Sequence, residues 1–362
     1  MPENTAYPRY PLAYPFAFPF VQEQTVCRTP PACALTPARA HLDLAALPLA
    51  DGKGVTAAVI GAFDAPRLHE DMARFDCAFS LPAADLSVEY LSTRRHTVSS
   101  WATEISADAE WLHAMAPAAK IIAVVAADSH LDSLTAAVER AAKKGAKVIS
   151  MSYGMAEFAS QTAFDERLAK TDALLVASAG DEGGRVYYPA SSPYVLAVGG
   201  CRTYRNGVGN VLRRTAITSG GGFSAYEKCP AWQKAVLPCG ESRRAVPDVA
   251  LDADMTPGYA VCSLYSGGWR VCGGTSVAAP IMAGICAGLL SLTPHVPARS
   301  ILPFLYELAA KDRYCFDDIV VGTSGTNRAG AGYDLCTGLG CPNVHLIAEA
   351  WRKAHEDDFV EK

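Results

Sequence analysis

The chain has 362 residues, of which 50% are hydrophobic and 19% charged, and its formal net charge is −5. This size and composition allow a large apolar core and exclude a wholly disordered chain. The slight negative charge and the scarcity of basic clusters argue against nucleic acid as a partner. No uninterrupted apolar run reaches about 18 residues, which argues against a membrane span.

The first 45 residues are predicted to form an N-terminal arm. It opens with MPENTAYPRYPLAYPFAFPF, whose alternating prolines and aromatic residues favour an extended segment lying over the domain surface. Near its end, TPARAHLDL predicts a short helix. The opening residues lack the basic start of a secretory signal, so the location stays open. The protein is either cytoplasmic, or secreted with a leader and pro-domain that are absent from this chain.

Apolar runs and amphipathic stretches alternate between residues 54 and 180. The runs predict strands buried on both faces, and they cover 54–63, 119–127, 146–154 and 173–180. The stretches between them predict helices over 66–78, 99–115, 131–145 and 157–171. This alternation is typical of an α/β fold with a doubly wound, mostly parallel sheet flanked by helices. We expect one such domain from residue 46 to residue 362.

Polar residues follow the predicted strands at the edge where a ligand is expected. In open parallel sheets the ligand lies beyond the carboxyl ends of the strands. Asp64, the Ser152-Tyr153-Gly154 segment and Asp181 all fall there.

The helix predicted over 99–115 carries two acids on its inward side. Its apolar stripe consists of Trp101, Ile105, Leu112 and Met115. Asp108 continues that stripe, and Glu104 lies four residues earlier on the same face. Two carboxyls directed toward a core lose hydration and repel each other unless they share a proton or meet a partner. Most such pairs form a solvated face, but the flanking tryptophans favour a functional pair here. Glu110 lies off the stripe, and we expect it on the surface.

The segment YAVCSLYSGGWRVCGG (259–274) predicts a β-hairpin. A three-residue loop would set Cys262 opposite Cys272, either as a disulfide or as two facing thiols.

The next stretch, GGTSVAAPIMAGICAGLL (273–290), is apolar enough to predict a buried helix. Ser276 falls at its N-terminus, where free N–H groups favour a developing negative charge. Pro280 is tolerated in a first turn, which keeps the helix start near Ser276. Serine is also a common N-cap residue, so its position alone leaves an ordinary capping role open.

The amino-acid sequences of two of these segments resemble motifs of known peptidases. G-T-S-x-A-x-P at 274–280 resembles the nucleophile motif of subtilisin-like serine peptidases and of their relatives the sedolisins, or serine-carboxyl peptidases. ATEISADAEWLHAMAPAAKI resembles the sedolisin segment in which a glutamate and an aspartate four residues apart complete a Ser-Glu-Asp triad. A subtilisin needs an HGTHV-type histidine motif, which the chain lacks, and His96 has different surroundings. Asp181 stands where subtilisins have an asparagine and sedolisins an aspartate. The resemblance runs from about residue 50 to 350.

The resemblance implies a subtilisin-like fold and an endopeptidase of acidic pH optimum that forms an acyl-enzyme. It implies that Ser276 is the nucleophile, Glu104 the general base and acid, and Asp108 the residue that orients Glu104. Asp181, with the backbone N–H of Ser276, would bind the oxyanion. The chemistry is coherent, because a serine hydroxyl needs an adjacent base and a carboxyl pair can hold one pKa raised and the other lowered. Asp181 can donate a hydrogen bond only when protonated.

The segment 315–343 is rich in aspartate and glycine, a composition found most often in a turn-rich loop. It resembles the sedolisin calcium loop, which implies one structural Ca²⁺, a cation that takes about 6–8 oxygen ligands. The implied ligands are the carboxylates of Asp318 and Asp334 and the carbonyls of Ile319, Gly330 and Gly332.

The resemblance also implies contacts with an extended peptide substrate. The implied residues are Ser152, Tyr153, Gly154, Ser219, Gly220 and Gly221. We expect a peptide or unfolded protein as substrate, no nucleic acid or membrane partner, and a monomer. Three alternatives stay open: tripeptidyl-peptidase action, a subtilisin-type site that uses Asp64 and His96, and a catalytically silent peptide-binding protein on the same fold.

Overall fold

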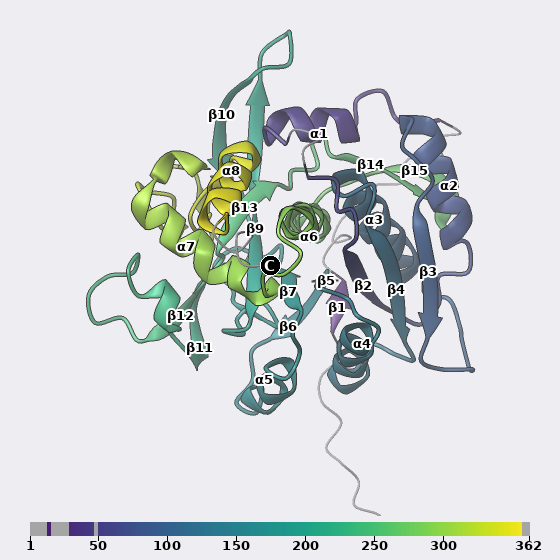
Figure 1. Cartoon of the computed structure of the whole chain (residues 1–362), viewed down its shortest axis with the longest axis horizontal. Helices are drawn as coiled ribbons and strands as arrows, with labels where there is room; N and C mark the ends of the chain where they lie inside the picture. The colour runs from purple at the N-terminus through teal and green to yellow at the C-terminus, as the bar shows by residue number, and fades with distance from the viewer. Residues whose placement is uncertain (1–12, 16–28, 47–49, 357–362) are drawn as a thin grey trace, which may run out of the picture.

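The computed structural model describes residues 13–15, 29–46 and 50–356. At its centre is an eight-stranded sheet in the order β10-β9-β7-β5-β2-β4-β3, with β13 paired to β9 (Figure 1). Every pairing in this sheet is parallel except that of β10 with β9. The predicted fold class is therefore confirmed. Most of the predicted N-terminal arm lies outside the described residues.

The elements have the following bounds. The strands of the central sheet are β2 (Thr56–Ala62), β3 (Asp85–Tyr90), β4 (Lys120–Ala126), β5 (Val148–Met151), β7 (Leu174–Ser178), β9 (Val195–Arg205), β10 (Val211–Ala216) and β13 (Val249–Asp252). The helices are α1 (Pro37–Asp43), α2 (Leu68–Phe79), α3 (Ser99–Met115), α4 (Leu131–Lys143), α5 (Thr162–Leu168), α6 (Thr275–Leu292), α7 (Ile301–Lys311) and α8 (Val344–Ala354). The smaller sheets contain β1 (Tyr14–Pro15), β6 (Tyr153–Ala156), β8 (Tyr187–Tyr188), β11 (Gly222–Lys228), β12 (Arg243–Val246), β14 (Tyr259–Ser263), β15 (Gly268–Cys272), β16 (Phe316–Asp317), β17 (Thr323–Ser324), β18 (Asn327–Arg328) and β19 (Cys341–Pro342).

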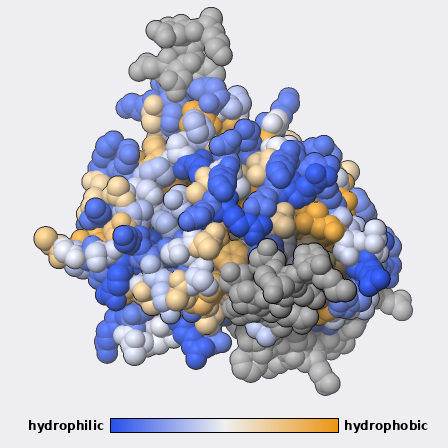
Figure 2. Space-filling view, turned by 90° about the horizontal axis from the view of Figure 1, so that it is seen from below, coloured by the Kyte–Doolittle hydropathy of each residue, from blue (hydrophilic) through white to orange (hydrophobic). Residues whose placement is uncertain are grey.

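Both faces of the sheet are covered by helices. Successive residues of a strand point to opposite faces, so Ala57 and Val59 join one apolar core while Ala58 and Ile60 join another. The first core includes residues of α2, α3 and α6, and the second includes residues of α4 and α5 (Figure 1). This double burial is why the inner strands β2, β4, β5 and β7 are continuous apolar runs in the sequence. On the outside, the face shown in Figure 2 is largely hydrophilic, with apolar residues in small scattered groups.

Helix α6 runs through the middle of the first core (Figure 1). By length and composition it is apolar enough to cross a membrane, but 89% of it is buried inside the protein, so it is a core helix. Gly284 allows α3 to approach α6 closely, because a Cβ there would lie 2.6 Å from the Cβ of Met115 and 2.8 Å from the carbonyl oxygen of Leu112. The helix with the two acids is therefore packed directly on the helix that begins near Ser276.

Several local predictions differ from the structure, and the helix predicted over 157–171 is confined to α5 (Thr162–Leu168). The strand predicted over 146–154 is divided at Ser152 into β5 and β6. Strand β3 was not predicted, because its alternately exposed residues do not form an apolar run. Strands β9, β10 and β13 of the same sheet, which follow residue 180, were not predicted either. In the β14–β15 hairpin, Cys262 lies opposite Trp269 and not opposite Cys272. The loop holds four residues, 264–267, instead of three, which shifts the register, and both thiols are free.

Candidate active site

Glu104 and Asp108 lie on the part of α3 that is enclosed by protein on every side. Residues 101–115 of this helix are all buried, and the exposed fractions of Glu104 and Asp108 are 1% and 0%. Burial raises the pKa of Asp108 well above its usual value, while a hydrogen bond from Ser152 acts in the opposite direction. Burial at this position therefore favours the protonated form of the Asp108 carboxyl.

Ser276 is the second residue of α6 and is fully buried. Its hydroxyl donates to the backbone carbonyl of Ser152, with 3.2 Å between the oxygens. The Ser152 hydroxyl in turn donates to Oδ1 of Asp108 at 2.6 Å, and it also lies 3.0 Å from the carbonyl oxygen of Ser276. Ser152 thus connects the acidic helix to the turn that carries the serine.

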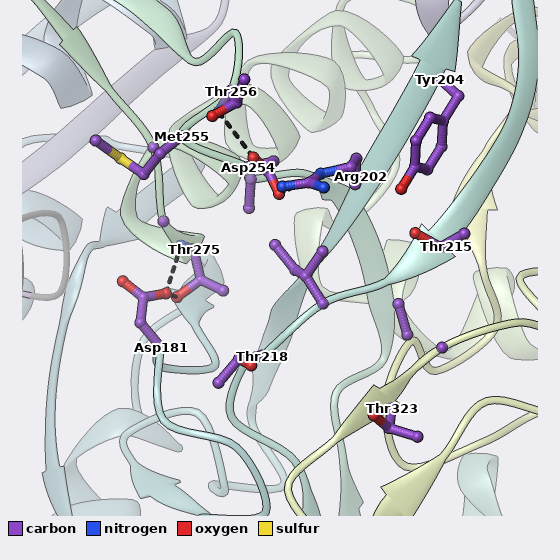
Figure 3. A pocket seen from close by; sticks show the side chains of 16 residues that line it. Asp181, Arg202, Tyr204, Thr215, Thr218, Asp254, Met255, Thr256, Thr275 and Thr323 are labelled. Atoms are coloured by element: carbon purple, nitrogen blue, oxygen red, sulfur yellow. Dashed lines mark hydrogen bonds and ion pairs between the residues drawn. The ribbon is translucent and has the colours of Figure 1, made fainter.

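Asp181 follows β7 and faces the start of α6. Its Oδ1 accepts hydrogen bonds from the backbone N–H of Thr275 at 2.8 Å and from the Thr275 hydroxyl at 2.9 Å (Figure 3). Its Oδ2 is buried and has no hydrogen-bond partner within the described part of the chain. Gly274 makes room for this carboxyl, because a Cβ at that residue would lie 2.5 Å from Oδ2.

The surroundings of Asp181 favour its protonated form. Burial raises the pKa of Asp181 to about 6, although the two hydrogen bonds from Thr275 act to lower it. When protonated on Oδ2, this carboxyl can donate a hydrogen bond beside the helix start that holds Ser276.

A cavity of about 640 Å³ opens next to Asp181 (Figure 3). One wall is the backbone of Gly273, Gly274 and Thr275, directly before Ser276. Arg202 and Asp254 line another part and form an ion pair at 2.6 Å. The cavity is large enough to receive side chains of a peptide, and it adjoins the predicted nucleophile.

The predicted substrate-binding segment at Tyr153 and Gly154 lies in β6, and another part of the chain pairs with it. Strand β1 is antiparallel to β6, with Tyr14 opposite Gly154 and Pro15 opposite Tyr153. Ala13 just before this strand is buried, and its N–H donates to the carbonyl of Ser129 at 2.8 Å. The edge assigned to substrate therefore accepts an extended peptide backbone from this chain itself.

The second predicted substrate segment, residues 219–221, lies against the loop that carries Asp181. The N–H of Gly220 donates to the carbonyl of Gly180 at 2.6 Å, and the N–H of Gly221 donates to the carbonyl of Arg185 at 2.7 Å. Ser219 is buried, and its N–H donates to the hydroxyl of Ser324 at 2.9 Å. The structure thus brings this segment beside the site.

The residues predicted to bind calcium lie together in the C-terminal loops. The N–H of Gly332 donates to Oδ2 of Asp318 at 2.9 Å, and the N–H of Gly330 donates to Oδ2 of Asp334 at 3.1 Å. Ile319 next to Asp318 is buried. Both carboxylates therefore flank one glycine-rich turn.

Glu110 was predicted on the surface, and the structure shows that this prediction is wrong. Its side chain is fully buried, and Oε2 accepts the backbone N–H of Cys262 at 3.0 Å. Nearby Asp71 is also buried and accepts the N–H of Leu264 at 2.8 Å. These carboxyls fasten the β14–β15 hairpin over α3. Nothing within the sequence of α3 indicates that a distant hairpin covers this side of the helix.

The residues of the subtilisin-type alternative do not form a catalytic pair. His96 is exposed, and its ring packs edge-on against Phe63, with 4.8 Å between the ring centroids. Asp64 faces Arg95 at 3.8 Å. No hydrogen bond or ion pair joins His96 to Asp64 within the described residues.

Comparison with known proteins decides the family. The profile of the Subtilase family matches residues 95–334, which is most of the chain. The chain belongs to the subtilase family. Among curated proteins it is 34% identical to kumamolisin from Bacillus sp. (strain MN-32), over 66% of this chain and 49% of that protein. It is 31% identical to sedolisin from Pseudomonas sp. (strain 101), over 56% of this chain and 40% of that protein.

Within the subtilases, the sedolisin resemblance is confirmed. The solved structure of Pseudomonas sedolisin in complex with pseudo-iodotyrostatin matches with a TM-score of 0.80 at 25% identity, over 89% of this chain and 99% of that one. Tripeptidyl-peptidase 1 of Dictyostelium discoideum is 31% identical over 56% of this chain and 38% of its own length. The chain thus spans about half, or less, of the length of these curated relatives.

The pKa of Asp181 provides a test of the site as described. In wild-type protein labelled with ¹³C-aspartate, the Asp181 carboxyl carbon should titrate near pH 6, and Asp181→Asn should remove that titration and so assign it. Thr275→Val should raise the pKa further, because it removes one of the two hydrogen bonds that favour the ionised form. A wild-type pKa near 4, or no change in the Thr275 variant, would contradict the described environment.

Proposed function

We propose that this chain is a serine-carboxyl endopeptidase that works at acidic pH. Ser276 attacks the peptide bond, Glu104 moves the proton, and Asp108 orients Glu104. The observation that supports the proposal most strongly is the burial of both carboxyls on α3, where this helix packs against α6 and its first-turn serine. The match to the subtilase family and the similarity to sedolisin add to that support.

The reaction proceeds in two halves, acylation and deacylation, and in each half Glu104 accepts a proton and then gives it up. The Ser276 oxygen bonds to the substrate carbonyl carbon while its proton passes to the Glu104 carboxylate. The tetrahedral intermediate then expels the amine, which takes the proton from Glu104 and leaves an acyl group on Ser276. Water adds to that acyl carbon and gives a proton to Glu104, which returns it to Ser276 as the acid product leaves.

Asp181 stabilises the oxyanion together with the backbone N–H of Ser276. The oxyanion needs donors that are fixed before the reaction begins. Two hydrogen bonds from Thr275 hold one oxygen of Asp181 in place, so the other oxygen is the one that carries the proton and donates.

These roles set opposite pH requirements. Glu104 must be ionised to accept the serine proton, so activity falls when the Glu104–Asp108 pair becomes fully protonated at low pH. Asp181 must be protonated to donate, so activity falls as the pH rises through its pKa of about 6. The pH–rate profile is therefore bell-shaped, with its maximum on the acid side of pH 6.

The substrate binds as an added strand on the edge of β6. Strand β1 supports this mode, since it pairs there in an antiparallel register and runs toward Ser152, whose carbonyl accepts the Ser276 hydroxyl. Ala13, directly before β1, is also held by the protein, because its N–H donates to the carbonyl of Ser129. The protein therefore contacts the peptide upstream of the two paired residues.

Loss of the nucleophile tests the proposal. Wild-type protein should cleave an internally quenched peptide library between about pH 3 and 6, and Ser276→Ala should reduce kcat by about 10³-fold or more. Ser291→Ala, at the far end of the same helix, should leave kcat unchanged. Cleavage that peaks above pH 7 or survives Ser276→Ala would contradict the mechanism. The absence of wild-type cleavage at every pH would favour a silent peptide-binding protein.

Competition by the N-terminal segment tests the substrate edge. Because β1 occupies the edge of β6, a variant without residues 1–28 should show a KM several-fold lower than the full chain, with kcat little changed. A synthetic peptide of residues 10–18 should raise the apparent KM of that variant. Equal KM values, together with no effect of the peptide, would show that substrate binds elsewhere.

We also propose that Asp318 and Asp334, with the carbonyls of Ile319, Gly330 and Gly332, hold one structural Ca²⁺. An all-oxygen donor set suits this cation, and the placement of both carboxylates against one glycine-rich turn supports the proposal. Arg313 lies 3.1 Å from Oδ2 of Asp318, so a cation already balances this carboxylate and would be exchanged for the metal ion.

Calcium should stabilise the fold without taking part in the chemistry. Free Ca²⁺ at 100 times its Kd should add about 2.7 kcal/mol to the free energy of unfolding, and a chelator should remove this gain. Asp318→Asn should abolish the calcium-dependent increase in Tm, while Asp132→Asn on α4 serves as a control that keeps it. A Tm independent of calcium in the wild type would rule out the site.

A further inference from the structure

The side chain of Ser152 has contacts that substrate binding does not require. In strand addition the substrate pairs with the backbone of residues 152–154, so the hydroxyl of Ser152 is free for another role. That hydroxyl is buried and lies 2.6 Å from Oδ1 of Asp108 and 3.0 Å from the carbonyl oxygen of Ser276. The Ser152 hydroxyl oxygen therefore links α3, which carries Glu104 and Asp108, to the first turn of α6, which carries Ser276.

Pro280 explains why the Ser276 carbonyl needs this hydroxyl. Within an α-helix the carbonyl of residue 276 would accept the N–H of residue 280. Proline has no N–H, so Pro280 leaves this buried carbonyl without its helical donor. The hydroxyl of Ser152 lies at hydrogen-bond distance and replaces the missing donor. A side chain from the junction between β5 and β6 thus replaces a missing hydrogen bond in the first turns of α6.

The Ser152 hydroxyl has one hydrogen for two acceptors. When Asp108 is ionised, its carboxylate and the Ser276 carbonyl compete for that hydrogen. When Asp108 carries a proton on Oδ1, it donates to the Ser152 oxygen, and Ser152 donates to the Ser276 carbonyl, so both acceptors are satisfied. The 2.6 Å distance between Ser152 and Asp108 is typical of a strong, charge-assisted O–H···O contact.

We propose that the Ser152 hydroxyl is a positioning residue that couples the protonation of Asp108 to the placement of Ser276 at the start of α6. This inference rests on the proposed function, because it assigns Asp108 and Ser276 to one reaction. The Ser152 hydroxyl touches neither the scissile bond nor the proton in transfer, although the backbone carbonyl of Ser152 accepts the Ser276 hydroxyl. It acts by holding Asp108 beside Glu104 and by fixing the helix turn that presents the nucleophile.

The titratable neighbours of this contact are few. Glu104 lies one helical turn before Asp108 on α3, and Tyr153 follows Ser152 on β6, where burial raises the pKa of its hydroxyl. Asp181 lies on the other side of the helix start, where it contacts Thr275. Removal of the Ser152 hydroxyl should therefore shift the titration of the Glu104–Asp108 pair and leave that of Asp181 unchanged.

The test uses Ser152→Ala in the full chain, with Ser150→Ala as matched control and Ser152→Thr as rescue. Ser150 is also buried, two residues earlier on β5, and its hydroxyl has no hydrogen-bond partner in the described structure. Ser152→Ala should lower kcat by about 10- to 100-fold, the effect of one lost hydrogen bond to a charged group. KM should stay unchanged, because the substrate-binding backbone is retained. Ser152→Thr should recover most of kcat, and Ser150→Ala should match the wild type.

The pH dependence separates positioning from a merely structural role. Because the Ser152 hydrogen bond lowers the pKa of Asp108, its removal should move the low-pH limb of the kcat profile to higher pH, while the limb governed by Asp181 stays in place. Unchanged kcat and an unchanged low-pH limb in Ser152→Ala would overturn the inference. So would equal losses in kcat and affinity with no rescue by threonine.

A second measurement keeps this inference distinct from the proposed function. The ¹³C titration of the Asp108 carboxyl needs no catalysis, and its pKa should rise in Ser152→Ala but not in Ser150→Ala. If wild-type cleavage proves independent of Ser276, the proposed function fails, and the titration still reports whether Ser152 is linked to Asp108. If cleavage depends on Ser276 and neither kcat nor the Asp108 titration responds to Ser152→Ala, this inference alone fails.

Discussion

The free-energy cost of ionising carboxyls in an apolar interior is the constraint on which this site depends. Glu104 and Asp108 lie on a helix that is buried on every side, and Asp181 lies beside the start of another buried helix. Burial favours the neutral form of each group. The same cause therefore lets the carboxyl pair hold a proton at mildly acidic pH and keeps Asp181 able to donate. Asp181 must keep its proton to donate to the oxyanion, whereas Glu104 must lose its proton to act as the base. The proposed chemistry therefore belongs to a window of acidic pH.

Four residues at the start of α6 bring these groups together, and each does so through the conformation or hydrogen bonding of the backbone. Gly274 has a φ of +94° and no side chain, which makes room for the carboxyl of Asp181. Thr275 then fixes that carboxyl with two hydrogen bonds, and Ser276 follows as the nucleophile. Pro280 frees a carbonyl that the Ser152 hydroxyl can reach. The motif therefore specifies a local geometry as well as a reactive residue, and each of its residues has a separate physical task.

Local patterns in the sequence were sufficient for the fold class, for strands β2, β4, β5 and β7 and for the acidic helix. These four strands are apolar runs because both of their faces are covered, and α3 has the predicted bounds of residues 99–115. The errors share a non-local cause. Glu110 is buried by a hairpin more than 140 residues away in the chain, and that contact leaves no periodic signal in the helix itself. The link from Ser152 to Asp108 and Ser276 likewise joins three separate segments, so the sequence indicated only a substrate contact for Ser152. The roles of the site residues, the calcium loop and the division into arm and domain stay predictions.

The most direct test of the account measures the protonation of the Glu104–Asp108 pair. Infrared spectroscopy of the wild type near pH 6 should show the C=O stretch of a protonated, buried carboxyl, and Asp108→Asn should remove or shift that band, while Asp132→Asn on the surface of α4 should not. This result would establish that burial keeps a proton on the pair at a pH where exposed carboxyls are ionised. If both carboxyls are ionised at pH 6 and titrate near 4, burial does not hold their proton, and the proposed acid-base chemistry of the site is wrong.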